Sequence, residues 1–386
     1  MPVVEDVGWV WRRMLRWDGE AGFRADRRLI HSGDLATRSG FRTLVAISAT
    51  LLVAMVASAA AGAWLIAGGG GLFPVLGGVA LLALAWLMRP RLGRIKRELR
   101  DRYKLPATHA PALHELIDRV ADATGAPRPQ LVTVDFDWNA SAMELGYRRT
   151  RVLTLGVPLM YALSPQELVG LIAHELGHFA HDGRRTLLTM PACTVFGTLS
   201  SALRPPPGDA IDRGFAGVYA LVYTLFQLVA GSVSLLLYAV HLAITAVDAR
   251  DSRRAELRAD GMAASAAGTA AALDLADTLA LLPELETYVQ HHVPEDDPGA
   301  HWRRMLATVR ERELPSVPWR RQLSIRTGAS LLASHPAPGR RHEWLSRQPR
   351  SYPRVTLAPE AADRIQVELR PYGRELRRRL ADQHPI

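Results

Sequence analysis

The fold of this chain is decided by residues 164–178, which read SPQELVGLIAHELGH. Ser164 is followed by a proline at the first helical position and by a glutamate three residues later, the capping pattern with which many α-helices begin. Apolar residues such as Leu168 and Ile172 then recur four apart, as they do along the buried face of a helix. We therefore predict a helix that runs from this cap through the histidines at its far end.

The predicted helix carries two histidines, His174 and His178, which lie four residues apart and so share one helical face. Both imidazoles can reach the same ion, and Glu175 between them can hold or deprotonate a bound water. Zinc suits imidazole nitrogen, and its catalytic sites keep one coordination position open for water. The pattern predicts a site for one Zn²⁺; the alternative is an exposed helix whose histidines are incidental.

A third protein ligand has two candidates. His181 faces the same side as His174, but three ligands from one helix would strain a tetrahedral site, so we interpret His181 as a neighbour of the site. Glu256 and Asp260 are a carboxylate pair four apart on a second helix, where one can bind metal and the other can orient a ligand histidine. Such pairs more often mark a solvated helix face, which remains the alternative.

These two motifs resemble those of the membrane zinc metallopeptidases that include the bacterial protease HtpX and the CAAX prenyl proteases. The resemblance runs from about residue 89 to residue 345, and it also includes residues 139–142 and the pair His335 and Pro336. It implies a mainly α-helical, multi-pass membrane protein with a zincin-like catalytic domain that contains a small β-sheet. It also implies peptide-bond hydrolysis with one zinc ion per chain.

The resemblance implies a role for each residue of the two motifs. His174, His178 and Glu256 are the expected zinc ligands. Glu175 is the expected general base, and Asp260 is expected to support a ligand histidine.

The resemblance extends less directly to two further places. His335 and Arg341 are expected to stabilise the oxyanion or to position the substrate near it; a structural cap on the C-terminal helix is the alternative for His335 and Pro336. The segment that matches the family's substrate edge strand, where a peptide would add as an extra strand, could also be an ordinary turn. Its residues are Asn139, Ala140, Ser141 and Ala142.

Two runs without Asp, Glu, Lys or Arg exclude a wholly soluble protein, because about 20 apolar residues are enough to cross a bilayer. They extend from Thr43 to Met88 and from Gly214 to Val247. Four glycines at 68–71 divide the first run into a hairpin of two spans, for which a buried hairpin in a large soluble core is the alternative. Arginines flank the outer ends of this hairpin, so the positive-inside rule places both ends in the cytoplasm.

The two ligand helices must be separated by an even number of crossings, since their ligands meet on one side of the membrane. Residues 186–203 and 214–247 can supply two crossings, although the first is polar for lipid contact. If it does not cross, neither does the second, and both would lie in the interface or cover the site. We expect a multi-pass protein of the cell membrane whose catalytic domain faces the cytoplasm, with the zinc near the membrane surface.

These runs also predict the order of domains. Inside the catalytic domain, hydrophobic spacing predicts a helix over 112–124 and strands over 131–136 and 151–155. The expected domains are an N-terminal cytoplasmic arm (1–42), a transmembrane hairpin (43–88), the first part of the catalytic domain (89–185), two further hydrophobic segments (186–247), the second part of the catalytic domain with the third ligand (248–345) and a basic C-terminal tail (346–386).

Composition limits the remaining function classes. The 386 residues include 47 Lys and Arg against 38 Asp and Glu, a net charge of +9. The arginines are scattered without interleaved stacking aromatics, so we expect no nucleic acid as partner and interpret them as a solvated or headgroup-facing surface. The single cysteine, Cys193, excludes an intrachain disulfide and a cysteine-based zinc site.

The sequence therefore predicts an integral-membrane zinc metalloendopeptidase that acts at the cytoplasmic membrane surface in membrane-protein quality control. Its expected partners are a peptide or protein substrate and the lipid bilayer. The alternatives are a catalytically silent membrane scaffold of the same fold and a dedicated protease for one membrane or lipidated substrate. The sequence does not indicate an oligomeric state, a cleavage specificity or a role for residues 273–322.

Overall fold

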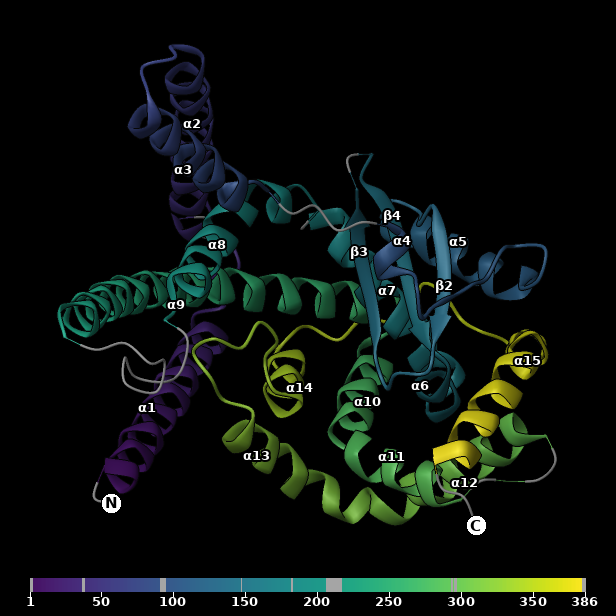
Figure 1. Ribbon diagram of the computed structural model, residues 1–386. Helices are drawn as coiled ribbons and strands as arrows, with labels where there is room; N and C mark the ends of the chain where they lie inside the picture. Colours follow the sequence, from purple (N-terminus) through teal and green to yellow (C-terminus); the bar gives the residue numbers. More distant parts are fainter. Residues whose placement is uncertain are drawn as a thin grey trace. The chain divides into compact units, whose positions relative to one another are not determined.

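The computed structural model of the chain describes residues 3–36, 39–90, 95–146, 148–181, 183–205, 217–292, 294 and 297–383. The described residues are mainly α-helical and include a four-stranded sheet, which confirms the predicted mainly α-helical fold with a small sheet (Figure 1). Its residues form two compact units that alternate along the sequence. The first contains 1–36, 92–183 and 252–386, and the second contains 37–91 and 184–251.

The sheet of the first unit has the strand order β1-β2-β4-β3. Strand β2 runs parallel to β4, whereas β1 pairs antiparallel with β2 and β3 pairs antiparallel with β4. Among the described residues, β3 is therefore an edge strand with one side unpaired. The strands are β1 (Tyr103–Lys104), β2 (Leu131–Asp135), β3 (Ala140–Leu145) and β4 (Thr150–Gly156).

Strands β2 and β4 confirm the two strands that the sequence predicts, but the segment between them differs from the turn alternative. Residues 140–142 belong to β3, with Ala140 opposite Leu155 and Ala142 opposite Leu153. The ordinary-turn interpretation is therefore wrong for these residues. Their small, half-buried side chains carry no β-branched or aromatic signal, so only the pairing with β4 makes them a strand.

The first half of the first unit packs its helices around this sheet. Helix α5 confirms the predicted amphipathic helix: it buries Leu113, Leu116, Ile117 and Val120 and ends at Gly125, whose φ of 68° suits glycine. The helices of this part are α4 (Ile95–Glu98), α5 (Pro111–Thr124), α6 (Val157–Ala162) and α7 (Pro165–His181).

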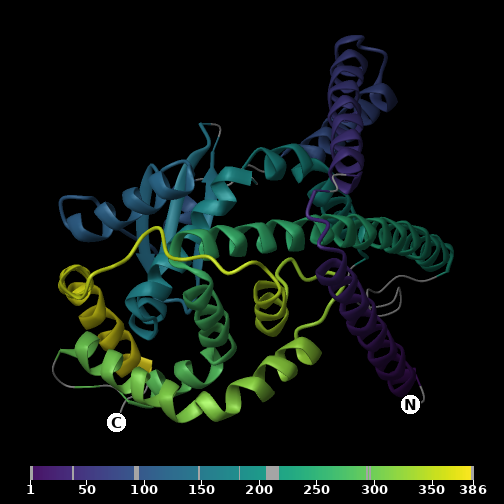
Figure 2. The ribbon, with the colours of Figure 1, turned by 180° about the vertical axis from the view of Figure 1, so that it is seen from behind.

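The second half of the first unit is helical, including the residues that carried no sequence motif. Helices α12 and α15 lie side by side in both views of the ribbon (Figures 1 and 2). Ile365 and Leu369 of α15 are fully buried, so the segment expected to be a basic tail contributes to the core. The helices are α10 (Thr269–Ala280), α11 (Leu282–His291), α12 (Pro298–Glu313), the 3-10 turn η1 (Leu314–Ser316), α13 (Val317–Thr327), α14 (Pro338–Ser346) and α15 (Pro359–Gln383).

The N-terminal helix α1 (Val3–Ser32) also belongs to the first unit. It contacts α13 and α14, which lie about 300 residues later in the sequence. The segment expected to be a cytoplasmic arm is thus packed onto the unit that carries the predicted catalytic residues.

The second unit contains the apolar helices. Helices α2 (Ser39–Ala67) and α3 (Leu72–Met88) form a hairpin in which Gly62 approaches Gly78 so closely that a Cβ on Gly62 would lie 2.7 Å from the Gly78 carbonyl oxygen. Helix α8 (Gly183–Leu203) contacts the helix that follows it, where the Ser234 hydroxyl donates to the Ser200 carbonyl at 2.8 Å.

Helix α9 (Val218–Ala267) is continuous over 50 residues, beginning in the second unit and ending in the first. Two helices in the described part are long and apolar enough to cross a membrane, namely Gly40–Ala67 within α2 and Val218–Ala267, and the apolar helices Leu72–Met88 and Leu188–Leu203 are shorter. The number of crossings remains a prediction.

Candidate metal centre

Helix α7 begins with the capping box that the sequence predicts. The Ser164 backbone N–H donates to Glu167 Oε2 at 2.7 Å, and the Glu167 N–H donates back to Ser164 Oγ at 3.3 Å. Glu167 is 1% exposed, and its carboxylate also accepts two hydrogen bonds from Arg310 and one from Thr278. These bonds join the start of α7 to α12 and α10, which fixes the helix that presents the histidines.

Helices α7 and α9 approach closely at a pair of small residues. A Cβ on Gly177 would lie 3.1 Å from the Cα and 3.2 Å from the Cβ of Ala259. Gly177 precedes one predicted ligand on α7, and Ala259 lies between the two carboxylates of α9. The absence of a side chain at Gly177 therefore lets the histidine motif and the carboxylate motif face each other.

The three predicted ligands come together in this contact. Nitrogen and oxygen atoms of His174, His178 and Glu256 all lie within 4.8 Å of one another. His174 Nε2 is 3.4 Å from Glu256 Oε2, and His178 Nε2 is 3.4 Å from Glu256 Oε1. Two imidazoles and one carboxylate that converge in this way form the His₂Glu donor set of catalytic zinc sites.

The outer nitrogen of His174 faces Asp260. Nδ1 of His174 lies 3.0 Å from Asp260 Oδ1, which leaves Nε2 directed at Glu256. Asp260 is in turn bonded by Arg341, whose Nε lies 3.1 and 3.0 Å from the two carboxylate oxygens. A carboxylate on the far side of a ligand histidine fixes its tautomer and ring orientation, which is the role predicted for Asp260.

Electrostatics at His174 favour a positive charge. Burial and the nearby Arg341 guanidinium favour the neutral imidazole, but the carboxylates of Asp260 and Glu256 outweigh them and raise the pKa of His174 to about 9. A metal ion binds a deprotonated ring nitrogen, so metal binding at Nε2 competes with protonation of this imidazole.

A buried carboxylate oxygen gives a further reason why these donors fit a zinc ion. Glu256 Oε2 is buried, and it makes no hydrogen bond within the part of the chain that the structure describes. A buried carboxylate oxygen without such a bond is costly, and coordination of a cation removes that cost. The residues present therefore fit a zinc ion held by His174, His178 and Glu256.

The predicted general base directly follows the first ligand in the chain. Glu175 is 6% exposed and follows His174 on α7. The other histidine of this helix, His181, has a side chain outside the described residues, so its predicted place as a neighbour of the site stays untested.

His335 and Arg341 reach the centre in different ways. His335 Nδ1 lies 2.8 Å from Glu256 Oε1, and the His335 side chain is 71% exposed. The Arg341 side chain donates to Asp260, and its Nη2 lies 3.2 Å from His174 Nδ1. Helix α14 is capped at Ala337 without a side-chain hydrogen bond, so the geometry gives no support to the capping alternative for His335.

The predicted substrate segment lies at the start of the edge strand. The Gly156 N–H donates to the Asn139 carbonyl at 2.9 Å, and a Cβ on Gly156 would lie 1.9 Å from the Asp137 carbonyl oxygen. Glycine at this position therefore allows the chain to enter β3. Since hydrogen-bonded pairs alternate along an antiparallel ladder, the backbone groups of Ala140 and Ala142 point away from β4 and toward the unpaired side.

Sequence reasoning did not predict the arginine partners that hold Glu167 and Asp260 in place. The bonds from Arg310 to Glu167 and from Arg341 to Asp260 join residues far apart in the chain. A capping box gave a signal for Glu167, but nothing near Arg310 marks it as the partner.

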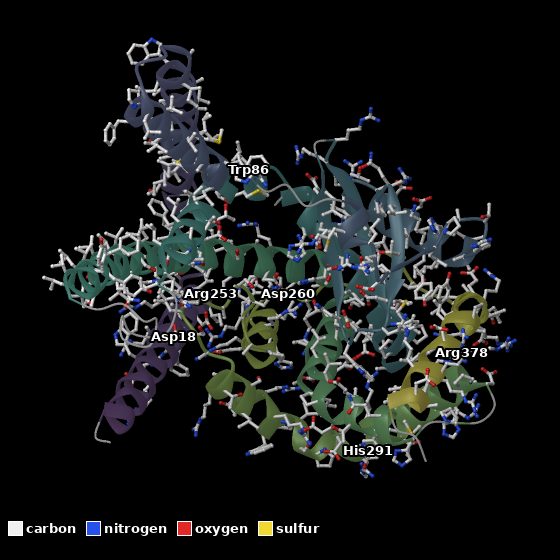
Figure 3. The ribbon with its side chains drawn as sticks, in the orientation of Figure 1. Asp18, Trp86, Arg253, Asp260, His291 and Arg378 are labelled. Carbon is white, nitrogen blue, oxygen red and sulfur yellow. The ribbon has the colours of Figure 1, made fainter. Side chains whose placement is uncertain are left out.

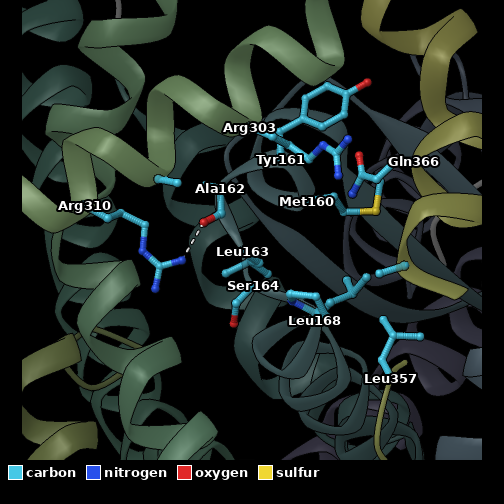
Figure 4. A pocket seen from close by; sticks show the side chains of 13 residues that line it. Met160, Tyr161, Ala162, Leu163, Ser164, Leu168, Arg303, Arg310, Leu357 and Gln366 are labelled. Atoms are coloured by element: carbon cyan, nitrogen blue, oxygen red, sulfur yellow. Dashed lines mark hydrogen bonds between the residues drawn. The ribbon is translucent and has the colours of Figure 1, made fainter. Parts of the chain in front are cut away.

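A cavity of about 190 Å³ lies elsewhere in the first unit, between α6, the start of α7, α12 and α15. Arg310 lines it and donates to the Ala162 carbonyl at 2.8 Å (Figure 4). None of the predicted site residues lines this cavity, so we do not assign it to the metal centre.

Comparison with models of protein families identifies a family for this chain. The model of Peptidase family M48 matches residues 107–348, which include all the residues of the metal centre. This chain belongs to Peptidase family M48. The resemblance inferred from the motifs is thereby confirmed.

Curated relatives of this M48 chain are named protease HtpX homologs. That of Acidiphilium cryptum is 35% identical over 198 residues, which are 50% of this chain and 64% of that protein. That of Gemmatimonas aurantiaca is 35% identical over 96 residues, 25% of this chain and 33% of that protein. That of Methanocaldococcus jannaschii is 32% identical over 94 residues, 24% and 31% of the two chains. The matched part thus spans less than two thirds of these relatives.

Proposed function

We propose that this M48 chain is a zinc-dependent metalloendopeptidase that hydrolyses peptide bonds at the cytoplasmic surface of the cell membrane. The observation that carries the proposal is the convergence of His174, His178 and Glu256 within 4.8 Å, with Glu175 next to the first ligand. Membership of a peptidase family and the names of the curated relatives support the same class of reaction.

The residues divide the chemistry among themselves. A zinc ion held by the three ligands would act as a Lewis acid that lowers the pKa of a water molecule toward about 7. Glu175 takes the proton from the attacking water and later gives it to the leaving amine. His335, beside Glu256 and exposed on its other side, donates to the oxyanion that develops. Arg341 holds Asp260, and Asp260 holds His174.

The membrane location rests on the apolar helices. Helix α9 carries an apolar stretch at its N-terminal end and the ligand Glu256 near its C-terminal end, while α2 is the other long apolar helix. We propose that both helices cross the bilayer, that the shorter helices α3 and α8 complete two hairpins, and that both ends of the chain lie in the cytoplasm. Substrates delivered by the membrane would then meet the centre directly, as expected for a protease of membrane-protein quality control.

The test compares two glutamate variants of the purified full chain. Glu175→Gln should retain one zinc ion per chain and lose peptide cleavage by about 100-fold or more, the share usually contributed by a general base. Glu115→Gln, an exposed position on α5, is the matched control and should cleave as the wild type does. Zinc content is measured by elemental analysis and cleavage with an unfolded protein substrate.

The alternative of a silent scaffold makes a different prediction in the same experiment. A scaffold would bind zinc or leave the site empty, and the wild type and Glu175→Gln would show equal background cleavage. Substantial cleavage by Glu175→Gln with full zinc content would contradict the assignment of the base. His174→Ala should lose both zinc and cleavage.

A further inference from the structure

The N-terminal helix α1 contacts the segment that precedes His335. A Cβ on Gly22 would lie 2.4 Å from the Ser330 carbonyl carbon and 2.7 Å from the Leu331 nitrogen. The backbone of α1 therefore lies directly against the backbone of this segment. Asp18, labelled on α1 in Figure 3, lies on the same face of this helix. Its Oδ1 accepts a hydrogen bond from the Leu331 N–H at 3.0 Å.

Arg253 of α9 also holds this segment. Its side chain is 2% exposed, and its Nη1 donates to the carbonyl oxygens of Ser330 at 3.3 Å, Leu331 at 3.2 Å and Ala333 at 2.8 Å. Its Nε lies 3.1 Å from Oδ1 of Asp26, which is a buried carboxylate of α1. One guanidinium thus joins α1, α9 and the segment 330–333.

Arg253 and the segment 330–333 both lie close in sequence to residues of the metal centre. Arg253 precedes Glu256 by three residues in one helix, and His335 follows Ala333 by two residues. His335 Nδ1 is 2.8 Å from Glu256 Oε1, although 71% of the His335 side chain is exposed. So exposed an imidazole has little packing to fix its rotamer, and its place beside Glu256 depends on the backbone that carries it.

We propose that α1 is a positioning element of the peptidase site: with Arg253, its residues Asp18, Gly22 and Asp26 hold the segment 330–333, which places His335 beside Glu256. The proposal rests on the proposed function, because it assigns His335 a part in that reaction. It gives the N-terminal helix of this chain a place in catalysis without any contact to the substrate. Displacement of a catalytic group by about 1 Å can cost about 100-fold in rate.

Two glycines of α1 provide a matched pair of variants. Gly22→Ala drives a methyl group into the backbone of Ser330, whereas the nearest atom to a Cβ on Gly19 is the Ala329 carbonyl oxygen at 3.6 Å, an ordinary contact. Both changes raise the helix propensity of α1 equally. We expect Gly22→Ala to lower kcat at least tenfold with unchanged zinc content and with KM within about twofold, and Gly19→Ala to match the wild type.

A double variant separates positioning from general damage. If Gly22→Ala acts through His335, it should cause no further loss in kcat once His335→Ala is present. If the two losses multiply instead, or if Gly19→Ala and Gly22→Ala have the same effect, the proposal is wrong. Should Gly22→Ala fail to fold, Asp18→Ala removes one hydrogen bond to Leu331 and takes its place, with the exposed Glu20→Ala as its control.

Hydrogen exchange provides a readout that does not need activity. In the full chain, amides of residues 328–337 should exchange at least tenfold faster in Gly22→Ala than in Gly19→Ala, while amides of α7 keep the wild-type rate. Unchanged exchange in 328–337 contradicts the proposal whether or not the protein cleaves peptides. If residues 328–337 exchange faster in Gly22→Ala but the wild type shows no cleavage that depends on Glu175, only the proposed function is contradicted.

Discussion

At the scale of single residues, the metal centre depends on a chain of buried side chains that pair with one another. His174 binds Asp260 at its outer nitrogen, Asp260 binds Arg341, and neither Asp260 nor the side chain of His174 is more than 6% exposed. In such a site each charged group depends on its partner, since a buried charge that loses its partner is strongly destabilised. The orientation of the histidine is therefore set by Asp260 and, through it, by Arg341.

We expect Asp260→Asn to lower zinc affinity by about 10-fold to 100-fold, because the amide holds the ligand tautomer of His174 less firmly. Competition with a zinc chelator measures the affinity. Asp277→Asn is the matched control: Asp277 also binds an arginine, Arg321, but outside the centre, and this variant should bind zinc as the wild type does. Equal zinc affinity in the two variants would contradict the role of Asp260.

The buried ion pair of Glu167 makes a prediction about stability. Glu167→Ala leaves Arg310 and the Ser164 N–H without their acceptor, so the first unit should lose about 3 kcal/mol of unfolding free energy. The exposed pair of Asp118 and Arg128 is the comparison, and Asp118→Asn should cost less than about 1 kcal/mol. Denaturant titration in detergent measures both, and a smaller loss for Glu167→Ala than for Asp118→Asn would exclude this account.

At the scale of elements, the edge strand β3 is the surface most suited to an extended peptide. Its Ala142 N–H points to the unpaired side, so Ala142→Pro removes one outward donor while the ladder with β4 stays intact. We expect kcat/KM for a peptide substrate to fall about tenfold with full zinc content. Ala142→Ser keeps the N–H and should behave as the wild type. Equal kcat/KM for the proline and serine variants would show that peptides bind elsewhere.

The sequence predicts the elements whose signals are local. The capping box and the periodicity of residues 164–178 predict α7, and the spacing of His174 and His178 predicts one face for two ligands. Local spacing does not predict strand β3, because its small residues become a strand only by pairing with β4; only the resemblance to the family predicts an edge strand there. The packing of α1 was not predicted either. Asp26 and Arg253 are ordinary surface residue types, and only their contact across the sequence buries them.

At the scale of the whole molecule, the apolar helices of the second unit expose many large apolar side chains. Val53 of α2 is 70% exposed, Trp64 is 74% exposed, and Leu221 and Leu235 of α9 are 70% and 69% exposed. Soluble proteins rarely expose apolar surface so continuously. The second unit has an apolar surface that suits a bilayer, whereas the first does not. The two parts together average to a composition close to that of soluble proteins.

We expect the full chain to stay with membranes through high salt and alkaline carbonate and to leave them only with detergent. Val53→Arg should lower the inserted fraction, because a central arginine costs about 2.5–3.5 kcal/mol on the insertion scale, whereas Val53→Leu should insert as the wild type does. Release of the wild type by carbonate, or equal insertion of both variants, would exclude a span at α2.

The interleaving of the first unit along the chain has a consequence for biosynthesis. Asp18 and Leu331, which are joined by a hydrogen bond, are separated by 313 residues. At about 5–20 residues per second, roughly 15–60 s of translation separate the two partners. Glu256 emerges only after the apolar helices, and His335 later still. The two histidines are therefore synthesised before the second apolar segment, and Glu256 and His335 after it, so the metal ligand set becomes complete only late in translation.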